Sequence, residues 1–300
     1  MPNVKAKDIL KDAAERGYCV GYFESWDLES TAAVVRAAEK MRSPVMIGFC
    51  GEYLASPERK YAEDIRLYGT FLKEMARSSS APTATLLNES TDIKYAYKGI
   101  GAGFDMVMFV DEEMRVERLT DLQKHLVEFA HSCDVSVEAE LGVLPTANRN
   151  TSEMSQGLNT DPELAARFVA ETGIDALAVA IGNVHLLEWE KAEIDLELLE
   201  KIHDKVSVPL VLHGGTGIDK SMFREAAARG IAKVNVGAGM KRVVINSYKR
   251  YFEENDVSGM NPNLILGRGG GADIQRLAHD ELVDFVAEFI KAFQGENKAR

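Results

Sequence analysis

The feature that most constrains the fold is a regular alternation of short apolar runs with longer amphipathic stretches. The apolar runs lack the alternating polar residues of a half-exposed strand, so each is predicted to be a strand buried on both faces. Such strands belong to a parallel sheet that is covered by helices. The predicted strands are Tyr18–Glu24, Pro44–Phe49, Pro82–Leu87, Met106–Val110, Val135–Leu141, Ala176–Gly182, Pro209–His213 and Lys233–Gly237.

Helical patterns fill the gaps between these strands. The predicted helices are Glu29–Arg42, Ser56–Arg77, Thr91–Gly101, Arg115–Cys133, Asp161–Thr172, Asp195–Lys205 and Asp219–Arg229. Eight strand and helix units in about 240 residues fit a closed barrel better than an open sheet. The predicted fold class is therefore α/β, a (β/α)8 TIM barrel.

Two further helices, Met240–Glu254 and Ala272–Phe293, follow the eighth predicted strand. The segment between them, Asn255–Gly271, is rich in Asn, Pro and Gly and is predicted to be a loop. Because no linker divides the chain, we expect residues 1–300 to form one TIM-barrel domain with a C-terminal helical extension from about residue 240.

Composition narrows the range of partners. The chain has 35 Lys and Arg against 47 Asp and Glu, a formal charge of -12, which argues against nucleic-acid binding. The N-terminus has no apolar segment like a signal peptide, and no run is long enough to cross a membrane. The three cysteines have neither metal-finger nor redox spacing. We expect a cytoplasmic protein that acts on a small molecule.

Polar residues gather where the predicted strands end, which is where TIM barrels carry their active sites. His185 and His213 follow neighbouring strands, and neutral imidazole with carboxylate is a usual ligand set for zinc, manganese or iron. Glu138 and Glu140 share one face of the fifth strand. Two acids that point into a barrel need a compensating cation, either a metal or Lys233, and a purely structural ion pair is the alternative.

Glycines follow the seventh and eighth strands, in Gly214–Gly217 and Asn235–Gly239. In TIM barrels this region commonly binds phosphate through loop amides and a helix N-terminus. Simple turn chemistry is the alternative. Because glycine-rich loops stand at two consecutive positions, we favour a phosphate site.

Taken together, these residues resemble the class II, metal-dependent ketose-bisphosphate aldolases. The resemblance covers nearly the whole chain. Its most specific parts are Val135–Gly142, Asp175–His185, Pro209–Gly217 and Gly230–Val236.

The resemblance implies a catalytic divalent metal, most often zinc, held by three histidines, of which His185 and His213 match two. It also implies a phosphate site and aldol cleavage or formation of a ketose phosphate through an enediolate. Homodimers or homotetramers are common in the family. The residues that match the family's phosphate site are Gly214, Gly215, Thr216, Asn235, Gly237 and Ala238.

The chain departs from the family pattern at the end of the third strand. Glu89 replaces the third zinc-binding histidine, and Asn88 replaces the aspartate that transfers protons. Asparagine does not exchange a proton at neutral pH, so Glu140 or Glu24 is predicted to take over this task. We therefore predict metal ligands from among His185, His213, Glu89 and Glu138, and catalytic positions at Asn88, Glu140 and Glu24.

Further departures affect the loops. Pro145–Arg149 replaces a glycine-rich loop with a mobile glutamate, and Leu186 replaces a glycine. Gly237 and Ala238 stand where aspartate and threonine are usual, which removes a hydroxyl donor. Two alternatives to an aldolase-type lyase follow from these losses. One is a metal-dependent epimerase or isomerase, and the other is a non-catalytic protein that binds a sugar phosphate.

Overall fold

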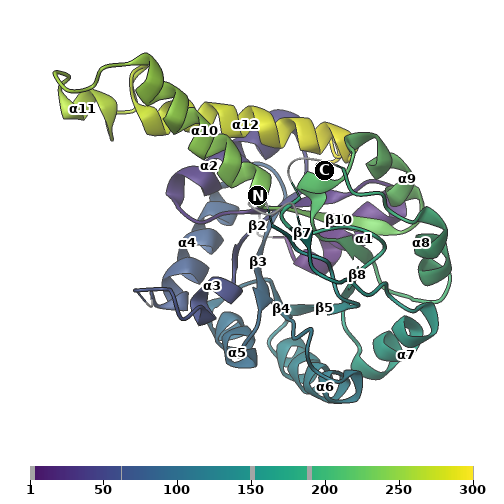
Figure 1. Cartoon of the computed structure of the whole chain (residues 1–300). Coiled ribbons are helices and arrows are strands. Elements are labelled where there is room, and N and C mark those ends of the chain that lie inside the picture. Colours follow the sequence, from purple (N-terminus) through teal and green to yellow (C-terminus); the bar gives the residue numbers. More distant parts are fainter. Residues whose placement is uncertain (1–3, 62, 149–152, 188–190, 300) are drawn as a thin grey trace.

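In the computed structural model, which describes residues 4–61, 63–148, 153–187 and 191–299, eight strands close into a parallel barrel (Figure 1). Around the barrel the strand order is β1-β10-β9-β8-β5-β4-β3-β2. The strands are β1 (Val20–Glu24), β2 (Val45–Cys50), β3 (Thr83–Ser90), β4 (Met106–Phe109), β5 (Ser136–Leu141), β8 (Ala176–Val179), β9 (Leu210–Leu212) and β10 (Ile231–Val236). All eight predicted strands and the predicted fold class are confirmed.

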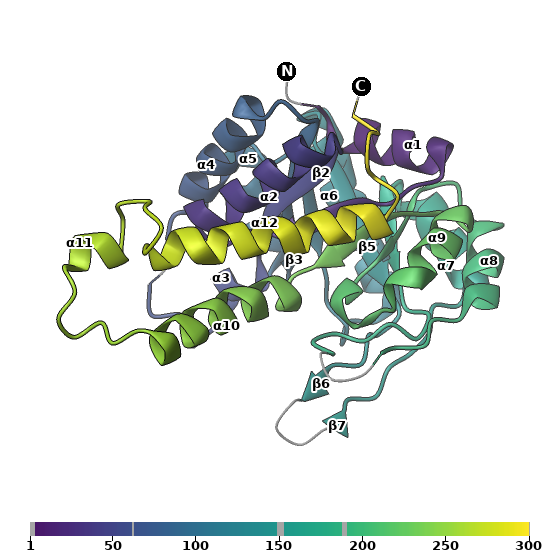
Figure 2. The ribbon, with the colours of Figure 1, turned by 90° about the horizontal axis from the view of Figure 1, so that it is seen from above.

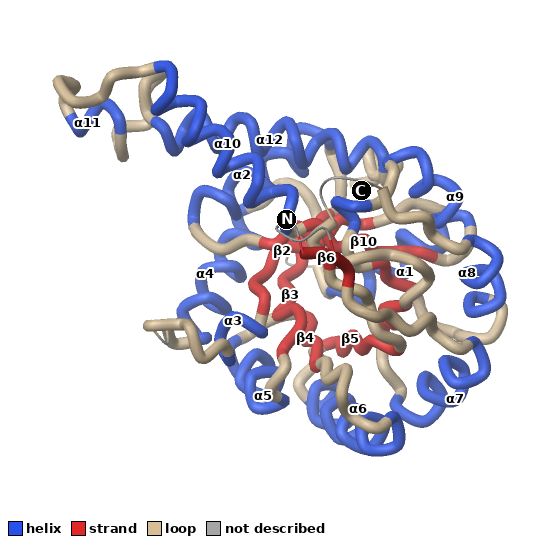
Figure 3. Tube along the Cα trace, in the orientation of Figure 1, coloured by secondary structure: helices blue, strands red, loops and turns tan. Residues whose placement is uncertain are grey.

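Helices form a ring around the strands (Figure 3). Each helix turns an apolar face inward, and together with the outward-facing strand residues these faces make the larger hydrophobic core. The ring consists of α2 (Leu28–Met41), α4 (Ile65–Ser78), α5 (Ile93–Ala102), α6 (Val116–Ser132), α7 (Pro162–Thr172), α8 (Leu196–His203) and α9 (Phe223–Ala228). The prediction of a helix after each strand is confirmed for the first seven strands.

The start of the second predicted helix, at Ser56, is wrong. A short helix, α3 (Glu52–Ala55), ends before it, and the described residues up to Asp64 are not helical. Ser56 has extended backbone angles, which the following Pro57 favours. The Asp64 side chain then caps α4 by accepting a hydrogen bond from the Arg66 amide.

The helix α1 (Ala6–Arg16), which precedes the first strand, was not predicted. Its buried residues Ile9 and Leu10 pack against barrel-interior residues such as Tyr22 and Met46. The apolar spacing of α1 is helical, but it is partly hidden by the surrounding charges. Figure 2 shows α1 at one end of the barrel, so the barrel interior is closed there and the site forms at the opposite end.

Three helices follow the barrel: α10 (Ala238–Glu254), α11 (Pro262–Ile265) and α12 (Ile274–Ala292). Figure 2 shows α10 and α12 side by side, with α11 projecting beyond the barrel. The predicted loop between them therefore contains the short helix α11. In the part of the chain that the structure describes, no helix combines the length and the apolar character needed to span a bilayer.

Candidate metal centre and active site

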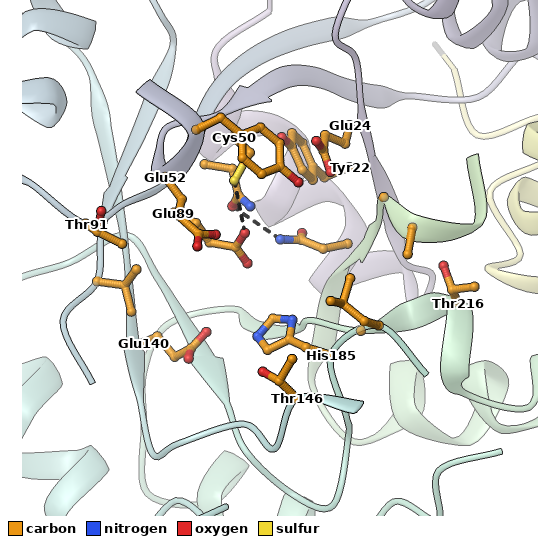
Figure 4. Close-up of a pocket in the computed structure, with 18 of the residues that line it drawn as sticks. Tyr22, Glu24, Cys50, Glu52, Glu89, Thr91, Glu140, Thr146, His185 and Thr216 are labelled. Carbon is orange, nitrogen blue, oxygen red and sulfur yellow. Dashed lines mark hydrogen bonds between the residues drawn. The ribbon is translucent and has the colours of Figure 1, made fainter. Parts of the chain in front are cut away.

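A cavity of about 590 Å³ opens at the carboxyl ends of the strands (Figure 4). Most of the predicted site residues lie on its wall. Glu138, His213 and Gly215 are buried just behind it. The predicted residues that line the cavity are Glu24, Asn88, Glu89, Glu140, His185, Gly214, Thr216, Asn235, Gly237 and Ala238.

The predicted metal ligands Glu89, His185 and His213 converge on one point. One ligand atom from each lies within 4.8 Å of the other two. His213 Nδ1 is 2.9 Å from Glu89 Oε1, and this buried nitrogen has no hydrogen-bond partner among the described residues. An unpartnered ring nitrogen that faces a carboxylate and a second imidazole is suited to a divalent cation. The residues therefore fit the metal that the family pattern implies.

A second group of possible ligands shares His185 with the first. Glu112, Glu140 and His185 also bring one atom each within 4.8 Å of one another. Glu140 Oε2 lies 3.1 Å from His213 Nδ1, so the two groups are adjacent. Carboxylates therefore lie on more than one side of the point where the candidate ligands converge.

Glu138 belongs to neither group and lies behind His213. Its Oε1 is 3.0 Å from His213 Nε2, and its Oε2 is 3.0 Å from Lys233 Nζ. A carboxylate accepts hydrogen bonds, so this contact places a hydrogen on Nε2 and directs Nδ1 at the cavity, where it offers a lone pair once a cation displaces its proton. The position of Glu138 is that of an orienting partner of His213, and its role as a direct ligand remains a prediction.

A chain of buried polar groups connects this pair to the cavity wall. Lys233 Nζ donates to Asn235 Oδ1 at 2.5 Å, and Asn235 Nδ2 donates to Asn88 Oδ1 at 3.3 Å. Asn88 is thus held in one orientation by its neighbour. At this position the resemblance described above implies an ionisable aspartate, whereas the amide of Asn88 cannot exchange a proton.

Burial and charge give the acids of the site different pKa values. The pKa of Glu140 is raised to about 7, mainly by burial; the charge of His213 opposes this shift, and the carboxylates of Glu89 and Glu112 add to it. Burial also disfavours ionisation of Glu89, but the close contact with charged His213 and the nearby His185 outweigh this effect and hold the pKa of Glu89 at about 2. Two neighbouring carboxyl groups therefore differ in proton affinity, as acid and base groups in active sites do.

The two histidines also differ. Burial opposes the charged form of His213, but Glu138, Glu140 and Glu89 outweigh it and raise the pKa of His213 to about 10. Burial lowers the pKa of His185. Without a metal, the positive charge that balances the carboxylates is therefore carried by His213, and a bound cation would replace its proton.

Two non-glycine residues at the site have left-handed backbone conformations. Glu89 has φ 46°, at a point where the pairing of β3 with β4 shifts register between Leu87 and Ser90. Leu186 has φ 59°, at the position where the family pattern has glycine. Such conformations cost about 1–3 kcal/mol each for non-glycine residues and are concentrated at functional sites. The strain lies at one proposed ligand and directly after another.

The loop after β5 holds His185 in place. The His185 amide donates to the Pro145 carbonyl at 2.8 Å, and the Ala147 amide donates to the His185 carbonyl at 2.9 Å. The loop continues into a small hairpin of β6 (Ala147–Asn148) and β7 (Glu153–Met154). Arg149 lies outside the described residues. Pro145 and Ala147 of this loop thus hold the His185 backbone through two hydrogen bonds.

Backbone amides form a cradle on the β9 and β10 side of the cavity. Gly214 has φ 69°, and a Cβ there would lie 2.4 Å from the Val184 carbonyl oxygen. The Gly239 amide, in the first turn of α10, donates to Thr216 Oγ1 at 3.2 Å. Free amides of the adjacent turn and of a helix N-terminus suit an anion such as phosphate.

Glu24 lies beside this cradle and does not face the metal ligands. A Cβ at Gly237 would come within 2.4 Å of Glu24 Oε2, so a glycine leaves room for this carboxylate. Lys241 Nζ donates to Glu24 Oε1 at 2.5 Å and to Tyr53 Oη at 2.8 Å. The structure therefore separates Glu24 from Glu140, the other predicted proton carrier.

Several residues of the site were not predicted. Cys50 has neither metal-finger nor redox spacing in the sequence, yet its Sγ is 3.5 Å from Glu89 Oε2 and it lines the cavity. Glu52 and Tyr53 also line the cavity, from α3. The sequence gives little indication of these two residues, because α3 is too short to show the helical spacing of apolar residues. Lys241 was not singled out, because in the sequence it is one of several charged residues in the helix α10.

Comparison with known proteins gives a consistent result. The model of the fructose-bisphosphate aldolase class-II family matches residues 4–298. The chain is 34% identical over 254 residues to the D-tagatose-1,6-bisphosphate aldolase subunit GatY of Klebsiella oxytoca, which covers 84% of this chain and 87% of that protein.

Solved structures agree with the sequence match. The crystal structure of the YdjI aldolase from Escherichia coli has a TM-score of 0.79 and 26% identity, covering 99% of both chains. The fructose-bisphosphate aldolase of Campylobacter jejuni has the same fold, with a TM-score of 0.76 at 19% identity over 98% of this chain and 96% of that one. The match over almost the whole chain shows that this protein belongs to the class-II fructose-bisphosphate aldolase family.

Proposed function

We propose that the protein is a divalent-metal-dependent aldolase-type lyase that cleaves or forms a carbon–carbon bond in a ketose phosphate or a related hydroxy-ketone. The observation that carries this proposal is the convergence of Glu89, His185 and His213 on one point of a cavity that also has an amide cradle. Family membership supports the reaction class.

The metal would be held by Glu89, His185 and His213, and Glu138 would orient His213 from behind. When bound, a divalent cation supplies Lewis-acid polarisation of the substrate carbonyl. We propose zinc, with manganese or iron as alternatives, because a set of two histidines and one carboxylate suits all three.

We propose Glu140 as the group that takes and returns the substrate proton. Its carboxylate lines the cavity and lies next to the proposed ligands, whereas the Glu24 carboxylate is paired with Lys241. Asn88 would orient the substrate through its amide and would not exchange a proton. The cradle of Gly214, Gly215, Thr216, Asn235, Gly237 and Ala238 would hold the phosphate.

A metal-dependent epimerase or isomerase is the second candidate. Asn88 favours it, because an amide stands where aldolases of the family have their proton-transferring aspartate. Both candidates remove a proton beside the carbonyl, but only the lyase produces an aldehyde fragment.

The test of the proposed function follows proton exchange at the ketone substrate alone, before any aldehyde is added. The zinc-loaded protein is incubated with dihydroxyacetone phosphate in heavy water, and deuterium incorporation is followed by NMR. We expect incorporation that chelation abolishes and that Glu140→Gln slows by about 10²-fold or more. Glu113→Gln is the control, since Glu113 is exposed and does not line the cavity.

Addition of glyceraldehyde then distinguishes the candidates. A new carbon–carbon bond supports the lyase. Exchange into a ketose without an aldehyde fragment would support the epimerase. Absence of exchange in the metal-loaded protein would contradict both and favour a non-catalytic sugar-phosphate binding protein.

We also propose that the protein acts as a cytoplasmic homodimer or homotetramer. The helices that project beyond the barrel expose apolar side chains, including Ile245, Phe252 and Leu266 at 52%, 54% and 57%. Exposed apolar side chains of this size are common at interfaces between subunits. Light scattering coupled to size-exclusion chromatography measures the assembly directly, and a monomeric mass would contradict the proposal.

A further inference from the structure

The two ends of the cavity differ in charge. The amide cradle follows β9 and β10, and Asp111 and Glu112 follow β4, which lies opposite β10 in the closed barrel. Glu52 of α3 extends the acidic end toward β2. Figure 4 shows Thr216 of the cradle on one side and Glu52 with Glu89 on the other. A substrate that spans the cavity therefore meets backbone amides and the paired Glu24 and Lys241 at one end, and carboxylates without a direct cation partner at the other.

No lysine or arginine stands among the described residues that line the cavity. A divalent cation held by Glu89, His185 and His213 would offset the charge of Glu89 and of the adjacent Glu140. The carboxylates of Glu52, Asp111 and Glu112 have no ammonium or guanidinium group in direct contact among the described residues that line the cavity, although Lys241 acts on Glu52 from a distance. The acidic end is thus less suited to a second phosphate group than the cradle is, since like charges repel.

The ammonium group of Lys241, on α10, already has partners within the protein. Its Nζ donates to Glu24 and Tyr53 and lies 4.5 Å from the centroid of the Tyr53 ring. The charge of Lys241 is therefore matched by Glu24 within the protein. By contrast, Lys191 Nζ contacts the carbonyl of Thr216 at 3.2 Å and adds positive charge at the cradle side.

We propose that the site selects a ketose with a single phosphate, held in the amide cradle, whose opposite end is an uncharged polyol chain. This inference rests on the proposed function and specifies its substrate class. In the direction of synthesis, the acceptor would be an aldehyde without a phosphate group. Glu52 and Glu112 would be specificity-determining residues that reject a phosphorylated acceptor.

The test measures binding of two matched ligands that cannot be cleaved. Isothermal titration calorimetry on the zinc-loaded protein compares D-glucitol 1-phosphate with D-glucitol 1,6-bisphosphate. We expect the monophosphate to bind at least about tenfold more tightly. Equal or tighter binding of the bisphosphate would overturn the inference, and so would failure of the monophosphate to bind.

Variants assign the preference to named residues. Glu52→Gln and Glu112→Gln are each expected to narrow the ratio of the two affinities about threefold or more, by removing one repelling charge. Glu113→Gln, next to Glu112 but outside the cavity lining, should leave the ratio unchanged. If the ratio responds equally to all three variants, the selection is not made by the cavity wall.

The donor-exchange assay keeps this inference separable from the proposed function. Loss of exchange with retained preference for the monophosphate would contradict the aldolase activity alone. Retained exchange with preference for the bisphosphate would contradict the single-phosphate substrate alone.

Discussion

Lys233 Nζ lies 3.0 Å from Glu138 Oε2 at the centre of the barrel, and both side chains have 0% of their surface exposed. The same carboxylate contacts His213 Nε2 through its other oxygen. Burial lowers the pKa of Lys233, but the charge and hydrogen bond of Glu138 oppose that shift. The ion pair thus sets the hydrogen-bonding state of a proposed metal ligand from inside the core.

Removal of the cation should destabilise the fold strongly. Lys233→Met leaves Glu138 buried without its ammonium partner, and we expect a loss of about 3–5 kcal/mol in the free energy of unfolding. The double variant Lys233→Met with Glu138→Gln should recover part of the loss, because it removes the unpaired charge. Urea unfolding followed by circular dichroism measures both.

Lys220→Met is the matched control for this prediction. Lys220 pairs with Glu288 at 2.7 Å, but both side chains are well exposed, so the loss should stay below about 1 kcal/mol. A loss in Lys233→Met no larger than in Lys220→Met would show that the buried pair is not a significant source of stability.

The barrel could be predicted because each strand is buried on both faces. Such strands are continuous apolar runs, and the side chains that end them, among them His213, mark the carboxyl end of the sheet. The convergence of Glu89 with the histidines follows from this topology. Helix α1 was missed, because its structure depends on packing against the barrel interior. The helix start at Ser56 was misplaced, because the following Pro57 favours an extended backbone there.

The different contacts of Glu138, Glu140 and Glu24 could not be predicted from the sequence. Glu138 and Glu140 share one strand face, yet Glu138 pairs with Lys233 and Glu140 faces the cavity. The contact of Glu24 with Lys241 joins residues 217 positions apart in the chain. These pairings depend on which side chains meet across the closed barrel, and the pattern of apolar residues within single strands does not specify those contacts.

Metal content should depend on His185. We expect His185→Ala to lose the metal that copurifies with the protein, or to bind added zinc at least tenfold more weakly, because one of three converging ligands is gone. Inductively coupled plasma mass spectrometry gives the stoichiometry. His125→Ala is the control, since His125 is exposed on α6. Equal metal content in the two variants would rule out His185 as a ligand.

Acid should weaken the contribution of Asp273 to stability. Asp273 caps α12 by accepting hydrogen bonds from the amides of Gln275 and Gly269, at 3.0 and 2.7 Å. Burial raises the pKa of Asp273, but these amides outweigh that effect and lower it overall. A folded-state pKa below the unfolded value of about 3.9 means that the stabilisation is complete above that pH and is lost as pH falls through the folded-state pKa.

We therefore expect Asp273→Ala to cost about 1–2 kcal/mol at pH 7, as is typical for loss of an N-cap, and less at pH 3. Thermal unfolding at both pH values provides the measurement. Asp284→Ala, exposed on the same helix, should change stability little at either pH. A cost for Asp273→Ala that is the same at pH 3 and pH 7 would contradict the role of its charge.

The cradle should bind phosphate more tightly once a hydroxyl is restored at residue 238. Ala238 begins α10 beside Thr216, whose hydroxyl already accepts the Gly239 amide hydrogen bond. Ala238→Thr adds a donor at the helix N-terminus, and a hydrogen bond to a charged group is worth about 1.5 kcal/mol, or about tenfold in affinity. Calorimetric titration with inorganic phosphate measures the gain. Ala238→Val has a similar shape without the hydroxyl and should give no gain, so equal affinities for the two variants would show that the lost hydroxyl does not limit phosphate binding.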